Sequence, residues 1–165
     1  MSKDSGFMTD KVTSIKIAGL GGMGVLKSSL ILAEVLFRQG WDVKKAEVHG
    51  MSQRGGSISS DVRFGKKVFS PMIPSGQVDY LVVLQQDQLP LYESACSPET
   101  VILKPDMIET DRLTNKRSLN VAMLGLLSRY LDIDAETWKS LICEMLPEKL
   151  CEVNKAAFEL GRQKE

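Results

Sequence analysis

Histidine, cysteine and long apolar runs are all scarce in this sequence. The 165 residues include one histidine, His49, and three cysteines, no two of which form a Cys-x-x-Cys pair. Structural zinc sites and iron-sulfur clusters each require several such ligands, so the chain is not expected to hold either centre by itself. Because the cysteines are odd in number and widely spaced, we interpret Cys96, Cys143 and Cys151 as reduced thiols rather than disulfide partners.

Charge and hydropathy exclude two classes of partner. The 21 Lys and Arg residues balance 21 Asp and Glu residues, and no basic cluster is visible, so neither nucleic acid nor an anionic membrane is an expected partner. The longest apolar run, residues 80–84, is too short to span a bilayer, and the polar N-terminus lacks the apolar segment of a signal peptide. We therefore expect a cytoplasmic protein.

The composition predicts one globular domain. Hydrophobic residues make up 43% of the chain and charged residues 25%, which is typical of soluble domains, and no repeat or linker divides the sequence. We predict a flexible N-terminus over residues 1–13 and a single domain over residues 14–165. Its expected class is three-layer α/β, with a mostly parallel Rossmann-like sheet, an antiparallel edge hairpin and a helical C-terminal third.

The first part of the chain alternates strand and helix. Ile15 and Ile17 open a strand that ends in "GLGGMG", apolar residues over 26–37 then recur at helical spacing, and Gly40 supplies a C-terminal stop. A second strand from Trp41 would complete a βαβ unit with a right-handed crossover. We therefore predict that these two strands are parallel neighbours.

The middle of the chain predicts a hairpin and two buried strands. Residues 58–64 alternate apolar and polar side chains and are followed by "GKK" and then "VFS" at 68–70, which indicates an antiparallel hairpin. The segments 78–84 and 100–104 are typical of strands covered on both faces, with a short helix between them that starts at Pro90.

The final third is predicted to be helical. Apolar residues over 118–131 recur at three- and four-residue steps, Asp134 can cap a helix over 135–146, and a last helix over 148–161 closes with Gly161.

The glycine turn after the first strand has two open interpretations. Gly19, Gly21 and Gly24 fit G-x-G-x-x-G, with Gly22 as an extra glycine. Between a strand and a helix, such glycines bring a phosphate close to backbone amides, and in a dinucleotide site Glu47 would bind the ribose. The same glycines also permit a helix to pack tightly on a sheet without any ligand.

The stretch "EVHGMSQRGGSISSD", residues 47–61, is the second candidate segment. Arginine grips phosphate or carboxylate, and consecutive glycines expose backbone amides to an anion. A serine hydrolase would require Ser52, Ser57, Ser59 or Ser60 to be activated by the lone histidine, which has no acidic residue beside it. The candidate contact residues are therefore His49, Ser52, Arg54, Gly55 and Gly56, and a purely structural turn remains the alternative.

Several stretches carry a resemblance to a known family. They are "IAGLGGMGVLKSSLILAEVLFRQG", "KAEVHGMSQRGGSISSDVRFGKKVFSPMIPSGQVDYLVVL", "LNVAMLGLL" and "EVNKAAFELG", which together run from about residue 14 to 161. These stretches closely resemble the gamma-type subunit or domain of 2-oxoacid:ferredoxin oxidoreductases. Within that family, "EVHGMSQRGGS" followed by "SPMIP" looks most like the small beta subunit of the indolepyruvate enzymes.

The resemblance implies an activity that this chain does not carry alone. Enzymes of the family convert a 2-oxoacid and coenzyme A to an acyl-CoA and pass two electrons through iron-sulfur clusters to ferredoxin, using thiamine diphosphate. The sequence has neither a Cys-x-x-Cys motif nor the Gly-Asp-Gly segment of thiamine-binding subunits. A larger partner should therefore hold thiamine diphosphate, magnesium and the clusters. No catalytic residue is expected here, and the two glycine segments should contact coenzyme A, substrate or the partner.

Overall fold

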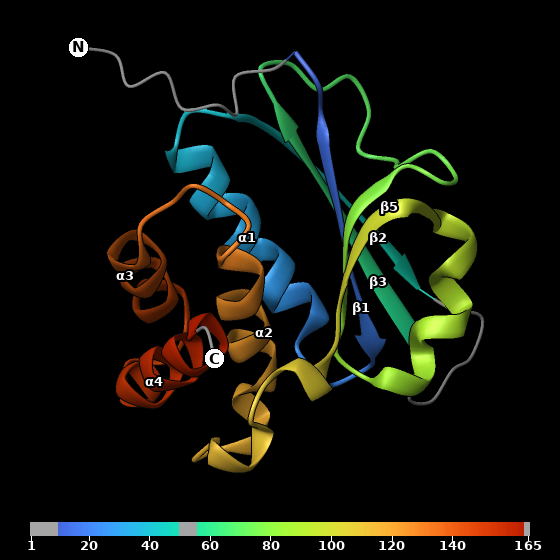
Figure 1. Ribbon diagram of the computed structural model, residues 1–165. Helices are drawn as coiled ribbons and strands as arrows, with labels where there is room; N and C mark the ends of the chain where they lie inside the picture. The colour runs from blue at the N-terminus through green and yellow to red at the C-terminus, as the bar shows by residue number, and fades with distance from the viewer. Residues whose placement is uncertain (1–9, 50–55, 164–165) are drawn as a thin grey trace.

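The computed structural model describes residues 10–49 and 56–163, which form a five-stranded sheet with helices on both faces (Figure 1). The strands are β1 (Thr13–Leu20), β2 (Asp42–His49), β3 (Ser57–Gly65), β4 (Val78–Val83) and β5 (Cys96–Leu103). The α-helices are α1 (Val25–Arg38), α2 (Leu119–Ser128), α3 (Ala135–Met145) and α4 (Cys151–Arg162). Five 3₁₀ helices complete the described chain: η1 (Gln86–Ala95), η2 (Pro105–Met107), η3 (Thr110–Arg112), η4 (Lys116–Ser118) and η5 (Glu148–Leu150).

The sheet order is β2-β3-β1-β4-β5, and β3 alone runs against the other strands. β1 pairs in parallel with β4 and β4 with β5, whereas β3 is antiparallel to both β1 and β2. The predicted α/β class with an antiparallel pair at one edge is confirmed. The prediction that β1 and β2 are neighbours is wrong, because β3 lies between them and matches eight residues of each.

The predicted hairpin partner of β3 is also wrong. Residues 68–70 do not form a strand, and the two edges of β3 pair with β1 and β2. The segment after β3 is instead held by a side chain, since the Arg63 guanidinium donates to the carbonyl oxygens of Ser70 at 2.9 Å and Met72 at 3.1 Å. Alternation along a strand determines which side chains share a face but does not select the partner strand.

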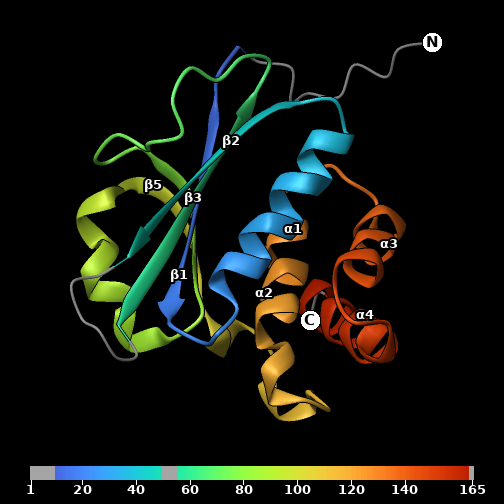
Figure 2. The same ribbon diagram turned by 180° about the vertical axis from the view of Figure 1, so that it is seen from behind.

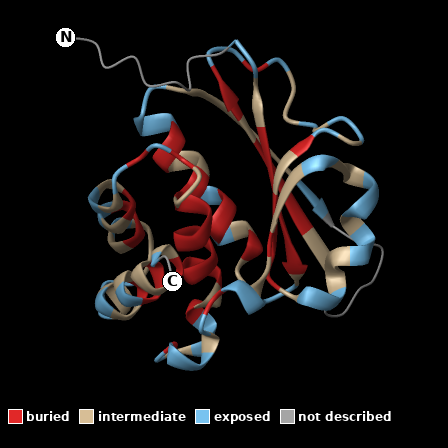
Figure 3. Cartoon of the chain, in the orientation of Figure 1, coloured by how far each residue is buried: buried red, intermediate tan, exposed pale blue. Residues whose placement is uncertain are grey.

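Two unequal layers cover the sheet. The helices α1 and α2 lie on one face with α3 and α4 outside them, and η1 lies on the other face, as the two opposite views show (Figures 1 and 2). Ile15 and Ile17 of β1 are fully buried in the helical core, whereas Ala18 belongs to a smaller apolar cluster with Leu81 and Val83 on the η1 side. Figure 3 shows the buried residues concentrated in α2, α1 and the central strands.

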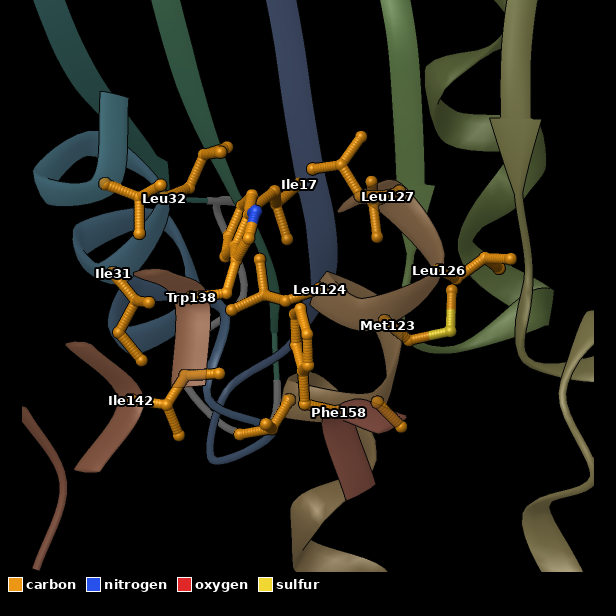
Figure 4. Close-up of a cluster of buried hydrophobic side chains, with 14 of the residues drawn as sticks. Ile17, Ile31, Leu32, Met123, Leu124, Leu126, Leu127, Trp138, Ile142 and Phe158 are labelled. Carbon is orange, nitrogen blue, oxygen red and sulfur yellow. The ribbon is translucent and has the colours of Figure 1, made fainter. Parts of the chain in front are cut away.

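The helical core centres on α2. Every residue of α2 after Leu119 is buried, and Figure 4 shows Leu124 beside Trp138 and Phe158, whose ring centroids lie 5.7 Å apart. Gly125 of α2 and Gly161 of α4 permit this packing, because a Cβ at Gly125 would overlap the Phe158 carbonyl.

Two predicted helix ends have different outcomes. Asp134 caps α3 as predicted, since its Oδ1 accepts a hydrogen bond from the Thr137 amide at 2.7 Å. The prediction that Gly161 ends the last helix is wrong: α4 continues to Arg162, and a Cβ at Gly161 would overlap the Ala122 carbonyl. This glycine therefore serves close helix packing rather than termination. On the other side of the sheet, the short helix predicted from Pro90 is a 3₁₀ helix that already begins at Gln86.

The prediction of three reduced thiols is wrong for two of them. Cys143 near the end of α3 and Cys151 at the start of α4 form a disulfide, with their Cα atoms 4.7 Å apart. The short connection through Pro147 brings the two helix ends together, which their spacing in the sequence did not indicate. Cys96 is free and half-buried, and burial raises the pKa of its thiol.

Candidate functional site

The glycine turn lies where β1 ends and α1 begins. Gly22 and Gly24 have φ angles of 86° and 81°, a left-handed backbone that side chains rarely adopt. The Met23 amide donates to the Leu20 carbonyl at 3.2 Å and closes the turn, and Gly24 is the N-cap of α1. The turn therefore places the first amides of α1 at the carboxyl edge of the sheet, where open α/β folds bind ligands.

The turn is fastened on two sides. On the β3 side, the Gly21 amide donates to the Gly56 carbonyl at 3.1 Å. On the helical side, the Asn120 side-chain amide of α2 donates to the Gly24 carbonyl at 3.4 Å. A side chain at Gly24 has no room, since its Cβ would lie 2.5 Å from Asn120 Nδ2, and a Cβ at Gly19 would lie 3.1 Å from Val25 Cγ2.

The second glycine segment ends beside this turn and begins two strands away along the sheet. In the sheet register, His49 at the end of β2 and Gly19 of β1 both lie opposite Ile58 of β3. Gly56, the last residue of the segment, lies against Gly21. The structure thus brings Gly56 against the turn, whereas the backbone of His49 lies on the same edge but two strands away from β1. Ser52, Arg54 and Gly55 lie outside the described residues.

A further polar residue, which the sequence did not single out, borders this edge. Gln88 of η1 accepts a hydrogen bond at 2.5 Å from the Ser57 hydroxyl, the first residue of β3. This contact joins residues 31 positions apart, and it depends on how η1 folds back over the sheet. No local pattern could have predicted it.

A buried ion pair lies beneath η1, on the face opposite the helical core. Lys16 Nζ is 2.5 Å from Asp61 Oδ1, both side chains are almost completely buried, and the two residues are register partners in β1 and β3. Lys16 also lies 5.9 Å from the centroid of the Tyr92 ring. Burial raises the pKa of Tyr92, and a hydrogen bond with Ser59 opposes that rise.

The strand order removes Glu47 from the dinucleotide interpretation. A ribose ligand at the end of the second strand requires that strand to lie next to the glycine turn, but β3 separates β2 from β1. Two strand spacings of about 4.8 Å place the β2 backbone roughly 10 Å from the β1 backbone. Glu47 itself accepts a hydrogen bond from Lys45 at 2.5 Å. The dinucleotide alternative for Glu47 therefore finds no support in this strand order.

The serine hydrolase alternative finds no support among the described serines. Ser59 and Ser60 are buried within β3, and the Ser57 hydroxyl is bonded to Gln88. Ser52 lies outside the described residues. A nucleophile must reach its substrate, so these positions in β3 do not suit acyl transfer.

The described residues do not fit the metal-dependent cofactors that the sequence resemblance implies for the complex. Over residues 10–49 and 56–163 there is no group of three or more His, Cys, Asp or Glu side chains that could hold a metal ion, and two of the three cysteines form the disulfide. Magnesium diphosphate and iron-sulfur clusters depend on such ligands. Among the same residues, no helix is long and apolar enough to cross a membrane.

Comparison with known families identifies the family to which the chain belongs. Residues 14–111 and 105–164 match the family described as pyruvate ferredoxin/flavodoxin oxidoreductase. The chain belongs to this family. The resemblance noted in the sequence is thereby confirmed. The indolepyruvate oxidoreductase subunit IorB of Thermococcus kodakarensis is 29% identical over an alignment of 191 residues. The alignment covers 92% of this chain and 95% of the relative.

Solved structures support the same fold. The gamma subunit of a keto/oxoacid ferredoxin oxidoreductase from Geobacter sulfurreducens has a TM-score of 0.74 at 21% identity, covering 91% of this chain and 96% of the neighbour. A 2-oxoglutarate:ferredoxin oxidoreductase from Magnetococcus marinus, with 2-oxoglutarate, coenzyme A and succinyl-CoA bound, has a TM-score of 0.79 at 19% identity. The match covers 93% of this chain but 31% of that larger one. The fold therefore occurs both as a separate subunit and as part of a longer chain.

Proposed function

We propose that this chain is the small, cofactor-free subunit of a 2-oxoacid:ferredoxin oxidoreductase that acts on indolepyruvate or another aryl pyruvate and is inactive alone. Membership of the family supports the reaction class. The Thermococcus relative, named as an indolepyruvate oxidoreductase subunit, supports the aryl substrate and matches nearly the whole chain.

The overall reaction assigns most of the chemistry to a partner. A 2-oxoacid and coenzyme A give an acyl-CoA, carbon dioxide, a proton and two electrons, and ferredoxin accepts the electrons. Thiamine diphosphate, magnesium and iron-sulfur clusters belong to the larger partner subunit, because the described residues here lack the ligand groups for them. Ferredoxin is reached only through the complex, and coenzyme A is the co-substrate. Neither nucleic acid nor a membrane is a partner in this proposal.

One hydrogen bond carries the proposed role of this chain. The bond from the Gly21 amide to the Gly56 carbonyl joins the glycine turn to the end of the 49–56 segment at the carboxyl edge of the sheet. Backbone amides at such an edge attract anions. We assign the contact with coenzyme A, substrate or partner to this edge. The proposed contact residues are Gly19, Gly21, Gly22, Gly24, His49, Ser52, Arg54, Gly55 and Gly56.

We also propose that the complex works in the cytoplasm, where the thiol pool is reducing. The Cys143–Cys151 disulfide would then be open to reduction in the cell. Alkylation of thiols during lysis, followed by mass spectrometry, measures the fraction of the pair that is oxidised. A fully oxidised pair in freshly trapped cells would contradict this location.

Reconstitution tests the proposed function directly. The chain, combined with the thiamine-bearing subunit, should support indolepyruvate-dependent and coenzyme A-dependent reduction of ferredoxin or a viologen dye, and neither subunit alone should do so. Full activity of the partner without this chain would refute the proposal. A panel of aryl and aliphatic 2-oxoacids in the same assay tests the substrate assignment.

Arg54→Ala separates ligand contact from partner contact. A complex that assembles normally but has a several-fold higher KM for coenzyme A or 2-oxoacid indicates that the 49–56 segment contacts the ligand. Lost assembly indicates contact with the partner, whereas normal assembly and turnover assign the segment a purely structural role. Arg112→Ala is the matched control, since Arg112 is an exposed arginine of η3 that pairs with Glu109.

A further inference from the structure

The outer edge of β2 is open in the described part of the chain. β2 is the last strand on its side of the sheet (Figure 2), and over residues 10–49 and 56–163 it pairs with β3 alone. The strand runs for eight residues, Asp42–His49, so a row of backbone donors and acceptors lies along its unpaired side. Such a row is a template for the addition of another strand.

The helix next to this edge carries apolar side chains on its outer side. α1 packs on β2 and β3. Leu30 is 45% exposed and Phe37 is 64% exposed, and a separation of seven residues places both on one side of the helix. Arg38 bonds to Glu144 of α3, which fixes the α3 side of α1 about 100° away from Phe37. Leu30 and Phe37 therefore form an apolar stripe that α3 leaves open, above the outer strands.

The charges of β2 permit one central register in which this strand pairs with itself. Two copies related by a two-fold axis normal to the sheet run antiparallel, and opposite residues share a face only when the axis passes through a residue. An axis through Lys44, Lys45 or Glu47 places identical charges against each other. An axis through Ala46 instead places Lys45 opposite Glu47 of the second copy, twice by symmetry. It also places Lys44 opposite Val48, which is 42% exposed.

The same register brings the two apolar stripes together. Lys45 lies opposite Val62 in the sheet register, and Val62 is part of the helical core, so the charged pairs lie on the face that carries α1. An axis normal to the sheet keeps this face on the same side in both copies. The two α1 helices then flank the joined β2 strands, and Leu30 and Phe37 of one copy face those of the other.

We propose that a second copy of this chain binds along the open edge of β2, centred on Ala46, so that two five-stranded sheets continue as one and the apolar stripes of α1 pack together. Charged residues on an edge strand normally prevent association, but here they leave one register and exclude its neighbours. The inference goes beyond the proposed function and does not depend on it. A complex with the larger subunit would contain two copies of this chain.

Sedimentation velocity of the 165-residue chain over a range of concentrations tests the self-association. A reversible monomer–dimer equilibrium is expected. A chain that stays monomeric at every concentration up to millimolar would overturn the proposal. If Lys45→Glu then also prevents assembly with the thiamine-bearing subunit, the β2 edge belongs to that partner instead.

Cysteine substitution locates the axis. In a Cys96→Ser background, Ala46→Cys places the two Cα atoms of residue 46 about 4.5–5.5 Å apart, within reach of a disulfide, and mild oxidation should give a covalent dimer on a non-reducing gel. Lys44→Cys is the matched control, because it lies on the same face but its two copies would be roughly 13 Å apart. A dimer in which Ala46→Cys does not link, or in which both variants link equally, would contradict the register.

Charge and apolar variants test the two components of the surface. Lys45→Glu should weaken dimerisation about tenfold, and Lys45→Glu/Glu47→Lys should restore it. Phe37→Ser should weaken dimerisation by a similar factor. Leu91→Ser is its control, because Leu91 is 59% exposed on η1, which covers the other face of the sheet. Equal dissociation by Phe37→Ser and Leu91→Ser, or a dimer unaffected by Lys45→Glu, would contradict the proposal.

Discussion

The two faces of the sheet are both buried, but by different means. Ile15 and Ile17 of β1 are fully buried in an apolar core beneath α1 and α2. Lys16, which alternates with them, is buried on the other face, where it pairs with Asp61 beneath η1. The helical face thus depends on close packing and the η1 face on a satisfied charge pair. Alternation of polar and apolar residues in a strand therefore does not by itself indicate a solvent-exposed face.

Removal of one member of the buried pair should have the largest effect. Asp61→Ala leaves Lys16 buried without its partner and should lower the free energy of unfolding by about 3–5 kcal/mol. The double variant Lys16→Met/Asp61→Leu removes both charges and should be close to the parent. Urea unfolding of the two variants measures this contrast. Equal losses in the single and double variants would show that packing rather than charge dominates the η1 face.

Overpacking between α2 and α4 should destabilise the helical face of the sheet. Gly125→Ala places a Cβ on the Phe158 carbonyl of α4, so the two helices must separate, at a cost of about 3 kcal/mol. Gly21→Ala is the matched control, because its Cβ would have no neighbour closer than 3.8 Å. Denaturant unfolding of both variants checks the prediction. A harmless Gly125→Ala would mean that α2 and α4 can part freely.

Loss of the disulfide should destabilise the helical side of the sheet alone, because its two cysteines lie in α3 and α4. The double variant Cys143→Ser/Cys151→Ser removes the disulfide that closes a short loop. The chain-entropy model predicts that this removal lowers the free energy of unfolding by about 2–3 kcal/mol. Dithiothreitol should lower the unfolding free energy of the parent by a similar amount and leave the double variant unchanged. Cys96→Ser controls for the loss of a free thiol. A parent that is insensitive to dithiothreitol would contradict the prediction.

The smallest expected effect is the pH dependence of the α3 cap. The hydrogen bond from the Thr137 amide holds the pKa of Asp134 below its usual value of 3.8. A carboxylate with a lowered folded-state pKa stabilises the fold fully above its unfolded pKa and loses that contribution as the pH falls through the folded pKa. The contribution should therefore begin to fall near pH 4 and be lost progressively at lower pH.

Asp134→Asn isolates that contribution, because asparagine caps a helix without titrating. Its melting temperature should fall less steeply than that of the parent below about pH 4. Glu144→Gln is the comparison variant, since Arg38 lowers the pKa of Glu144 and adds a second acid-sensitive term of the same sign. Parallel melting profiles of Asp134→Asn and the parent would remove the cap as a source of pH dependence.

The candidate site was predicted only where its residues form local patterns. The glycine turn from Gly19 to Gly24 and its place between a strand and a helix follow from spacing alone. Gln88 and Asn120 carried no such signal, because each comes to the site from a distant part of the chain. The Cys143–Cys151 disulfide was missed for the same reason, since it depends on the angle at which α3 returns to α4.

By itself, the sequence determined the local elements of this protein. The helix that ends before Gly40, the cap at Asp134 and the buried strand over 78–83 depend on periodicity and on residues a few positions apart. Only the tertiary structure decided that β3 lies between β2 and β1, and that Asn120 of α2 bonds to the glycine turn. Strand pairing and helix packing join residues far apart in sequence, and the free energy of those contacts exists only once the layers are assembled.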